Sequence, residues 1–429
     1  MDKLKVCIVC HFSNAKVREL LPLDDRRIYY FVRKIMRLPV KSESYVDLAA
    51  WDSYMIEQLR RRDDIELYVV SAHSGMKKRM RAFDLEGVHY YFVRCDVATM
   101  LKHIIPSPVL WHKVNPMRPA VRRIVKKVNP DIIALVGAEN PHIAGTVVGI
   151  KGYPLIVKCQ TIYNNPERKK HNEWDGKNAY VERIILENLQ YVAVNTKMHY
   201  DLFRQMNQTA INFHWRFGNL YPDVKPLDKE YDFVNFAMGI SDKKGFHDAV
   251  KALAIVKKAK PTVRLNLVGG GEAEVKQQVV DLVNQNGLQD NVIFTPSFEK
   301  QEDLFQHLQK SRFAVLPCKM DSVASTIRQS MHYGLPVVCY KTEGTPSLNH
   351  AKECVLIAEN GNVEDLAAKM LVLLNDPSKA DLLRINAKEY IDSVSDDAKI
   401  TQQMVDNFKA IVEHYRYGIP VPERLIANF

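Results

Sequence analysis

The stretch LPCKMDSVASTIRQSMHYGLPVV, residues Leu316 to Val338, decides the fold. An apolar run ends at Pro317, a polar loop follows, and a helical stretch begins near Ala324 or Ser325 and leads into a second apolar run. Two apolar strands joined by a helix predict a parallel crossover unit, because parallel strands need a connection of this length. We therefore expect an α/β fold in this part of the chain.

The same alternation continues in both directions along the chain. Short apolar runs predict strands, and stretches with apolar residues at three-to-four spacing predict helices between them. In the first half the expected strands are Leu4–Cys10, Ile65–Val70, Val88–Val93, Asp131–Val136, Pro154–Cys159 and Tyr191–Val194, with helices at 45–62, 119–128 and 179–189. In the second half the expected strands are Phe233–Met238, Arg264–Val268, Asn291–Phe294, Phe313–Leu316 and Val337–Tyr340, with helices at 247–258, 272–286, 302–309 and 325–333.

A break in composition separates the two halves. The segment FGNLYPDVKPLDKEYD, Phe217 to Asp232, holds two prolines and a cluster of charges, which is typical of a linker. We expect an N-terminal domain at 1–220, a linker at 221–231, a C-terminal domain at 232–400, and a C-terminal helix at 401–429 that packs back on the N-terminal domain. Both domains are predicted to be Rossmann-like, with parallel sheets facing across a cleft.

Composition narrows the class of protein. The chain has 429 residues, of which 46% are hydrophobic and 26% charged, as in globular proteins. No apolar run is long enough to span a bilayer, the start does not read as a secretory signal, and seven cysteines are too few for a disulfide framework. These features predict a cytoplasmic protein. The net charge of +10 favours anionic partners.

Three strand ends in the second half carry candidate phosphate-binding features. MGISDKKGF, residues Met238 to Phe246, places Gly239 at a strand end and Lys243 and Lys244 in a basic loop. LVGGGEAE places Gly270 where backbone can approach a ligand closely. Ser325 and Thr326 lie at a predicted helix N-terminus, where phosphate binds well. A solvated loop and an ordinary helix cap are the alternative interpretations.

Taken in order, these segments resemble the nucleotide-sugar domain of family 4 glycosyltransferases, which have the GT-B fold. The resemblance rests on Gly239 followed by Lys244-Gly245, on Val268-Gly-Gly-Gly-Glu272, and on Val292-Ile-Phe294. It continues through Leu316-Pro317, Gln329-Ser-Met-His-Tyr-Gly-Leu-Pro-Val-Val338 and Glu343-Gly-Thr-Pro346. It covers residues 234 to 377, whereas in the first half it rests on organisation more than on motifs.

Three family positions hold different residues here. The paired glutamates of the family correspond to Asp321 and Gln329, and the arginine of its first loop corresponds to Ile240. Gln329 keeps the size of glutamate and one hydrogen-bond acceptor, so it can still bind ribose hydroxyls. Lys243 can substitute for the arginine, although lysine is a point charge and not a bidentate fork.

The resemblance implies a retaining transfer of sugar from a nucleoside diphosphate to a hydroxyl, with the nucleotide sugar as co-substrate and without a metal or other cofactor. It implies catalytic roles for Lys244 and Asp321 and stabilisation of the leaving diphosphate by Lys244 and the helix start. The remaining donor-side positions are Gly239, Lys243, Gly270, Ser297, Phe298, Ala324, Ser325, Thr326 and Gln329. The acceptor-side candidates in the first half are His11, Glu139, His142 and Gln160.

The acceptor implied is a glycan or a lipid-linked glycan in polysaccharide or glycolipid assembly, and we expect no nucleic-acid partner. The basic segment WHKVNPMRPAVRRIVKK, Trp111 to Lys127, allows peripheral contact with an anionic membrane; a core-facing helix with a solvated basic side is the alternative. Two further hypotheses remain open, a nucleotide-sugar epimerase and a non-catalytic family member.

Cys7 and Cys10, in the first predicted strand, have a spacing that occurs in zinc sites. On a strand, residues three apart point to opposite faces, so we expect these two cysteines to be core residues rather than joint metal ligands.

Overall fold

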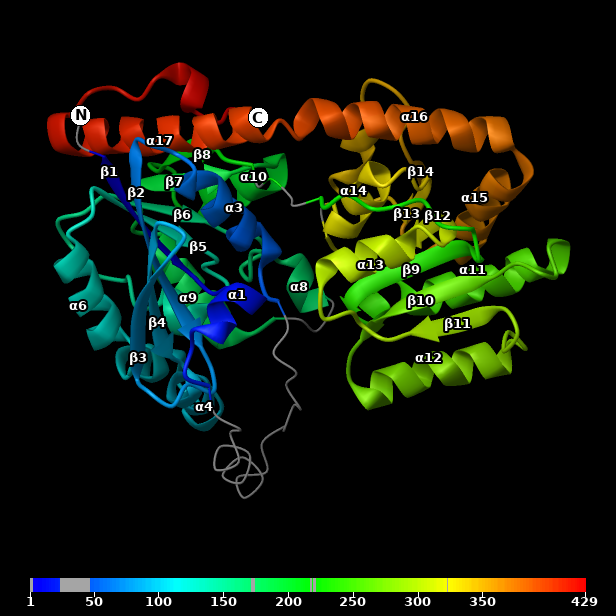
Figure 1. The fold of residues 1–429 in the computed structure, drawn as a ribbon, viewed down its shortest axis with the longest axis horizontal. Helices are drawn as coiled ribbons and strands as arrows, with labels where there is room; N and C mark the ends of the chain where they lie inside the picture. Colours follow the sequence, from blue (N-terminus) through cyan, green and yellow to red (C-terminus); the bar gives the residue numbers. More distant parts are fainter. Residues whose placement is uncertain (1–2, 24–46, 171–173, 217, 219–220, 322) are drawn as a thin grey trace. The chain divides into compact units, whose positions relative to one another are not determined.

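The computed structural model describes residues 3–23, 47–170, 174–216, 218, 221–321 and 323–429. Contacts divide the chain into two units, one of residues 1–220 with 397–429 and one of residues 221–396. Each unit is a sheet with helices packed on both faces (Figure 1). Most of the charged stretch between Asn14 and Ser44 lies outside the described residues.

The first unit contains an eight-stranded sheet in the order β3-β4-β2-β1-β5-β6-β7-β8. All neighbouring strands run parallel except β3 and β4. The crossovers confirm the predicted α/β fold. The strands are β1 (Leu4–Cys10), β2 (Ile65–His73), β3 (Met80–Leu85), β4 (Val88–Arg94), β5 (Ile132–Val136), β6 (Leu155–Lys158), β7 (Tyr191–Val194) and β8 (Ile211–His214).

The antiparallel edge strand β3 was not expected from the sequence. Its side chains are largely exposed, so it has none of the apolar runs that mark the buried strands. Glu86 and Gly87, both with positive φ, form a tight turn that reverses the chain into β4. Strand β3 therefore forms because the turn at Glu86 and Gly87 reverses the chain, and not because its side chains are buried.

Helices cover both faces of the first sheet. The ones that the sequence predicted are present, with bounds that differ by a few residues. The helices of this unit are α1 (Ala15–Glu19), α3 (Ala50–Arg60), α4 (Asp96–Ile104), α5 (Pro108–Lys113), α6 (Arg118–Val128), α7 (Pro141–Ala144), α8 (Glu167–Lys170), α9 (Gly176–Leu186), α10 (Lys197–Met206), α17 (Asp397–Tyr417) and the short 3₁₀ helix η3 (Glu423–Leu425).

Strand β1 separates the two apolar cores of this unit. Val6, Ile8 and Cys10 belong to one core, and Cys7 and Val9 belong to the other. The alternation along a strand sends successive side chains to opposite faces of the sheet. The prediction that Cys7 and Cys10 are core residues on opposite faces is therefore confirmed.

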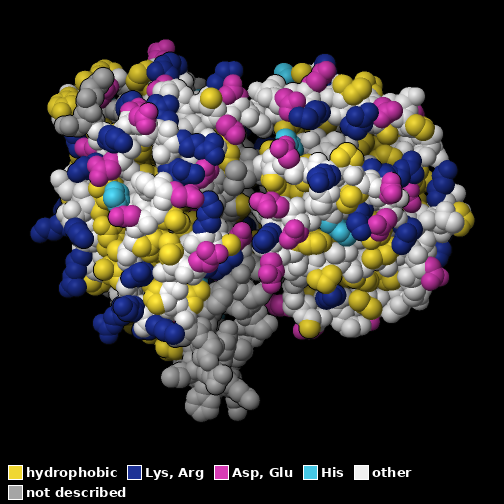
Figure 2. Space-filling view, viewed as in Figure 1, with side chains coloured by type: hydrophobic (Ala, Val, Ile, Leu, Met, Phe, Trp, Pro, Cys, Tyr) yellow, Lys and Arg dark blue, Asp and Glu magenta, His cyan; other side chains and the backbone are white. Residues whose placement is uncertain are grey.

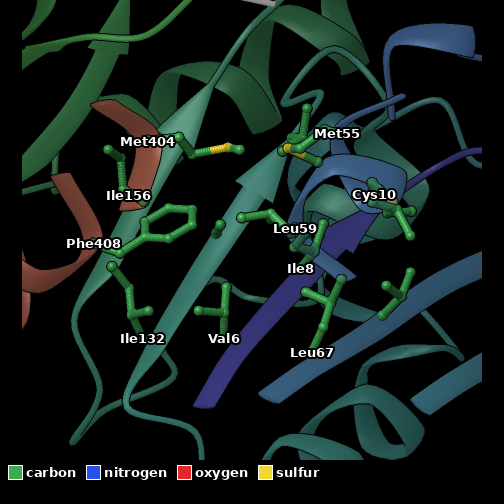
Figure 3. Close-up of a cluster of buried hydrophobic side chains, with 14 of the residues drawn as sticks. Val6, Ile8, Cys10, Met55, Leu59, Leu67, Ile132, Ile156, Met404 and Phe408 are labelled. Atoms are coloured by element: carbon green, nitrogen blue, oxygen red, sulfur yellow. The ribbon is translucent and has the colours of Figure 1, made fainter. Parts of the chain in front are cut away.

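The C-terminal helix α17 completes the first of these cores. Met404 and Phe408 pack with Val6, Ile132 and Ile156 (Figure 3). Polar contacts add to this packing: the side-chain amide of Asn407 donates to the His214 carbonyl at 2.8 Å, and His414 shares a 2.7 Å hydrogen bond with the Tyr191 hydroxyl. Helix α17 thus stabilises strands that precede it by 193 and 223 residues at these two contacts.

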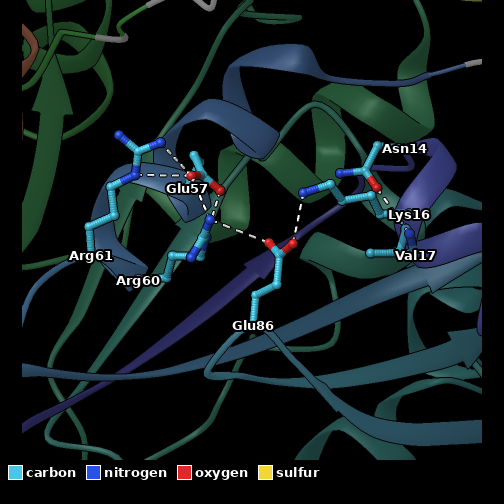
Figure 4. A network of polar contacts seen from close by, with 7 residues as sticks. All are labelled: Asn14, Lys16, Val17, Glu57, Arg60, Arg61 and Glu86. Carbon is cyan, nitrogen blue, oxygen red and sulfur yellow. Dashed lines mark hydrogen bonds and ion pairs between the residues drawn. The ribbon is translucent and has the colours of Figure 1, made fainter.

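A polar network ties the loop after β1 to the rest of this unit (Figure 4). Asn14 caps α1 by accepting a hydrogen bond from the Val17 amide at 3.0 Å. Glu86, at the β3–β4 turn, contacts Lys16 at 2.8 Å and Arg60 of α3 at 3.4 Å. Glu57 accepts hydrogen bonds from Arg60 and Arg61, which hold the pKa of this carboxyl below its ordinary value although burial opposes them. Such part-exposed pairs each contribute about 0–1 kcal/mol, so the network orients the loop more than it stabilises it.

The second unit is an all-parallel six-stranded sheet in the order β11-β10-β9-β12-β13-β14. Its strands are β9 (Tyr231–Gly239), β10 (Leu265–Gly270), β11 (Val292–Thr295), β12 (Ser311–Leu316), β13 (Val337–Tyr340) and β14 (Leu356–Ala358). The helices are η1 (Asp242–Lys244), α11 (Phe246–Ala259), α12 (Ala273–Gln285), α13 (Gln301–Leu308), α14 (Ser325–His332), η2 (Thr345–Asn349), α15 (Val363–Asn375) and α16 (Pro377–Val394). Every strand predicted in this half is confirmed; β14 was missed because only three residues pair.

Truncating Phe408 tests the contribution of α17. Its ring is fully buried and lies 5.4 Å from the ring of Trp215. We expect Phe408→Ala to lower the free energy of unfolding of the first unit by about 3–5 kcal/mol, because it leaves a cavity in the core. All four tryptophans (Trp51, Trp111, Trp174 and Trp215) lie in this unit, so tryptophan fluorescence in urea reports its unfolding.

The matched control is Tyr417→Ala, at the exposed end of the same helix, which should change this free energy by less than about 0.5 kcal/mol. A similarly small effect of Phe408→Ala would contradict the role assigned to α17.

Candidate functional site

The loop after β9 presents the two predicted lysines on a short 3₁₀ helix. Helix η1 contains Lys243 and Lys244 and ends at Gly245, which has φ of +79°. A Cβ atom at this glycine would lie 2.1 Å from the carbonyl oxygen of Pro317. Glycine is therefore required after Lys244, both for the left-handed conformation and for the close approach of the loop that follows β12.

Lys244 and Asp321 form an ion pair between these two loops. The residues lie 77 positions apart, and the parallel sheet brings them to the same edge. Burial alone would raise the pKa of the Asp321 carboxyl, but the ammonium of Lys244 more than offsets this and holds the pKa below its ordinary value. The Asp321 carboxyl is thus ionised at neutral pH. The two residues predicted as catalytic are in contact.

Glycines at the end of β10 keep the neighbouring backbone close. The Ile240 amide donates to the Gly270 carbonyl at 2.7 Å. A Cβ atom at Gly270 would lie 3.0 Å from the Ser297 hydroxyl, whereas one at Gly239 would meet nothing within 4 Å. Gly239, Gly270 and Ser297 therefore come together, with open space beside Gly239.

Helix α14 begins at Ser325, as predicted. Its N-cap is Ala324, which has no side-chain oxygen, so the first backbone N–H groups receive no side-chain cap. The alternative interpretation of Ser325 as an ordinary cap is wrong, because Ser325 is already inside the helix. Ile327 and Met331 face the core, while Thr326 and Gln329 are half-buried. This helix start can accept an anion.

Phe298 packs beside His307, with ring centroids 5.2 Å apart. Ser297 next to it is exposed. Lys244 contacts Asp321, and Gly270 lies beside Gly239 and Ser297. Within the part of the chain that the structure describes, no hydrogen bond or ion pair joins Phe298 or Gln329 to these residues.

In the first unit, two predicted histidines meet. His11 follows β1 and His142 lies on α7, and their rings stack edge to face with centroids 4.7 Å apart. Burial, and to a lesser degree the neighbouring His11, lower the pKa of His142 well below its ordinary value. His142 is thus neutral at neutral pH, which leaves one ring nitrogen able to accept a hydrogen bond.

Glu139 and Gln160 are also brought together. The Gln160 amide donates to Glu139 Oε1 at 3.3 Å, and Glu139 Oε2 is buried with no protein hydrogen-bond partner among the described residues. Burial raises the pKa of Glu139 to about 8. The carboxyl is therefore largely protonated at neutral pH and can donate as well as accept.

Sequence reasoning missed the ionisable groups around Glu139. Asp52 on α3 is 2% exposed, and burial together with the charge of Glu139 raises its pKa well above the ordinary value. Lys158, at the end of β6, is fully buried, and burial lowers its pKa to about 7. Glu182 on α9 is also fully buried and accepts hydrogen bonds from the amides of Tyr163 and Asn164, both at 2.9 Å. Only the burial of Lys158 had a signal, since it stands inside the apolar run LIVK.

Two absences are found among the described residues. No group of three or more His, Cys, Asp or Glu side chains is arranged to hold a metal ion. In the same part of the chain, no helix combines the length and apolarity that crossing a membrane requires.

Replacing Glu139 tests its protonation. The folded protein holds a proton on Glu139 that the unfolded chain releases above about 4.5, so stability from this group falls as pH rises from about 4.5 to about 8. Glu139→Gln should flatten this part of the pH profile of the unfolding free energy, measured by tryptophan fluorescence in urea. The exposed Glu187→Gln is the control and should keep the wild-type profile; equal slopes in all three proteins would refute a raised pKa.

Known proteins share both the sequence pattern and the fold. Residues 220–390 match the family model described as Glycosyl transferases group 1. An uncharacterized glycosyltransferase of Haemophilus influenzae is 26% identical over 152 residues, 34% of this chain and 42% of that protein. The amylovoran biosynthesis glycosyltransferase AmsK of Erwinia amylovora is 26% identical over 142 residues, 31% of this chain and 34% of that protein. The matches thus span less than half the length of these relatives.

Solved structures extend the likeness to nearly the whole chain. Sucrose-phosphate synthase from Thermosynechococcus elongatus has a TM-score of 0.68 at 15% identity and covers 95% of this chain and 98% of its own. Anabaena HepE in complex with UDP and glucose has a TM-score of 0.63 at 15% identity, covering 84% and 96%. At these identities the likeness establishes the fold, which is GT-B, and residues 220–390 match the model of the glycosyl transferases group 1 family.

Proposed function

We propose that this protein is a retaining, metal-independent glycosyltransferase that moves a sugar from a nucleoside-diphosphate sugar to a glycan or lipid-linked acceptor. The observation that carries the proposal is the Lys244–Asp321 ion pair, held between the loops after β9 and β12. Strand ends of parallel sheets are where such folds bind ligands. The match of residues 220–390 to the glycosyl transferases group 1 model supports the same reaction class.

The donor diphosphate needs positive charge, because negative charge builds on it as the glycosidic bond breaks. Lys244 supplies a cation, with Lys243 beside it on η1. The uncapped N-terminus of α14 at Ala324, Ser325 and Thr326 adds backbone N–H groups and the positive end of a helix dipole. These groups stabilise the leaving group without a metal or another cofactor.

The remaining donor contacts follow from side-chain chemistry. Asp321 stays ionised and can accept hydrogen bonds from sugar hydroxyls, and Gln329 can bind the ribose as a neutral partner. Open space beside Gly239 lets the diphosphate approach backbone. Ser297 and Phe298 follow β11, where we place the nucleotide base. The presence of UDP in the HepE complex supports a nucleoside diphosphate as ligand.

The acceptor is assigned to the first unit. Glu139 is protonated and can donate a hydrogen bond, and His142 is neutral and can accept one. His11 and Gln160 lie beside them, and burial keeps water largely away from these groups. A hydroxyl acceptor both donates and accepts, so this set suits it. The role of AmsK in amylovoran biosynthesis supports a polysaccharide or glycolipid product.

We place the reaction at the cytoplasmic face of a membrane. Residues 97–130 contain no acidic residue, and α6 exposes Arg122, Arg123, Lys126 and Lys127. Dark blue side chains mark the edge of the first unit where α6 lies (Figure 2). The apolar face of α6 is buried in the core, so apolar contact with lipid would come from Val109, Leu110 and Val114, which are 41%, 51% and 42% exposed.

Removing the central cation tests the reaction. We expect Lys244→Ala to weaken donor binding by about 1.5–3 kcal/mol, a factor of about 10 to 150, because a charge-assisted contact to the diphosphate is lost. A thermal-shift panel of UDP-, GDP- and ADP-sugars first identifies the donor base, and calorimetry then compares affinities. The exposed Lys341→Ala, at a residue that pairs with Glu359, is the control and should bind as the wild type does.

Products then separate the three hypotheses. Slow donor hydrolysis or transfer with an α-linked product from an α-linked donor supports a retaining transferase. Binding without turnover would favour a non-catalytic member, and a nucleotide sugar with one inverted ring carbon, seen by nuclear magnetic resonance, would favour an epimerase. Equal donor affinity in wild type and Lys244→Ala would refute the assigned phosphate site.

Vesicle co-sedimentation tests the membrane surface. Binding should rise with anionic lipid and fall with salt, since each basic residue near the surface contributes about 1 kcal/mol. Changing Arg123, Lys126 and Lys127 to Glu should lower binding at least about 100-fold, whereas changing the exposed Lys251 and Lys258 of α11 to Glu should not. An absence of wild-type binding at low salt would refute this part of the proposal.

A further inference from the structure

Lys319, which the sequence pattern did not single out, connects several parts of the donor-side loops. It follows β12 and Cys318, and its backbone amide donates to the Lys243 carbonyl at 3.0 Å. Its own carbonyl accepts a hydrogen bond from the Asn360 side chain at 3.0 Å. The main chain at Lys319 therefore joins the loop after β9 to the segment after β14.

The side chain of Lys319 binds two carboxylates. Its Nζ atom lies 2.9 and 3.0 Å from the two oxygens of Asp242 and 3.2 Å from Asp248. Asp248, on the first turn of α11, also accepts a 2.9 Å hydrogen bond from the Tyr340 hydroxyl at the end of β13. Burial works against the charge on Lys319, but these carboxylates raise its pKa above the ordinary value, so the ammonium persists.

The ion pair between Lys319 and Asp242 affects donor binding because of where Asp242 lies. Asp242 is the first residue of η1, and Lys243 and Lys244 follow it directly. An uncompensated carboxylate there would repel a diphosphate and would compete for the lysine ammonium groups. The Lys319 ammonium group neutralises the Asp242 carboxylate. The Lys319 backbone amide also fixes η1, because it donates to the Lys243 carbonyl.

We infer that Lys319 is a positioning residue for donor binding, which holds η1 through Asp242 and the Lys243 carbonyl so that Lys243 and Lys244 present their charge to the diphosphate. The inference rests on the proposed function. The arginine of the family that the sequence resembles has no counterpart here, because its position is occupied by the buried Ile240. Lys319 acts through its neighbours and does not touch the donor.

Lys319→Met, which keeps length and removes charge, is the central variant. Titrations use whichever of UDP, GDP and ADP the wild-type chain binds best, and steady-state hydrolysis of the matching sugar nucleotide gives KM and kcat. We expect Lys319→Met to weaken nucleotide binding and raise KM about tenfold, with kcat within about twofold of wild type. Lys319→Arg, which keeps the charge, should stay within about threefold in KM, and Lys341→Met, at an exposed lysine pair, should match wild type.

A second variant separates positioning from folding. If Lys319→Met acts by leaving Asp242 uncompensated, adding Asp242→Asn to it should restore most of the lost affinity. A merely structural loss would instead grow or stay the same in the double variant, and that result would overturn the inference, as would unchanged affinity in Lys319→Met or a loss confined to kcat. If Lys319→Met does not fold, the comparison of Lys319→Arg with Asp242→Asn decides: the inference requires the first to bind like wild type and the second to bind at least as tightly.

The proposed function and this inference fail differently. A wild-type chain that binds none of the three nucleotides would overturn the proposed function and the inference that rests on it. Nucleotide binding by the wild type with the same affinity in Lys319→Met would overturn the inference alone.

Discussion

The close packing of the loop after β9 against the loop after β12 is the constraint on which the donor side depends. Gly245 and the Pro317 carbonyl approach so closely that no side chain fits between them. This contact sets where η1 ends and α11 begins, and it brings Lys244 within reach of Asp321. An exposed ion pair is worth little by itself, but here the backbone already holds both loops, so little side-chain entropy remains to be lost.

The ionisable groups at the strand ends have opposite tendencies in the two units: they stay charged in the second unit and shift toward neutral forms in the first. At the strand ends of the second unit, Lys319 and Asp321 keep their charges because each has an opposite partner. At those of the first unit, burial shifts Glu139 and His142 toward their neutral forms. A charged site suits a diphosphate and a neutral polar site suits a hydroxyl. This division follows from desolvation and pairing alone, and it agrees with the assignment of donor and acceptor.

Sequence reasoning captured the features whose signals are local. Parallel strands such as LKVCIVC are buried on both faces and read as continuous apolar runs, so most of them could be predicted, whereas the short parallel strands β8 and β14 were missed. The exposed edge strand β3 gave no such signal. Asp52 and Lys158 could not be found either, because their perturbed pKa values arise from burial by residues distant in sequence. Lys319 was missed for the same reason: its partner Asp242 lies 77 positions away.

The absence of the family arginine has a structural reason. Ile240 is 4% exposed, belongs to the apolar core around Phe246, and is tied through its backbone to Gly270. A guanidinium at this position would have to leave that core, so restoring the residue would not restore its role. The cations of this loop are lysines, and Lys244 is held by the carboxylate of Asp321. Lysines offer point charges rather than a planar fork, so the proposed donor site would recognise the charge of a diphosphate more than its geometry.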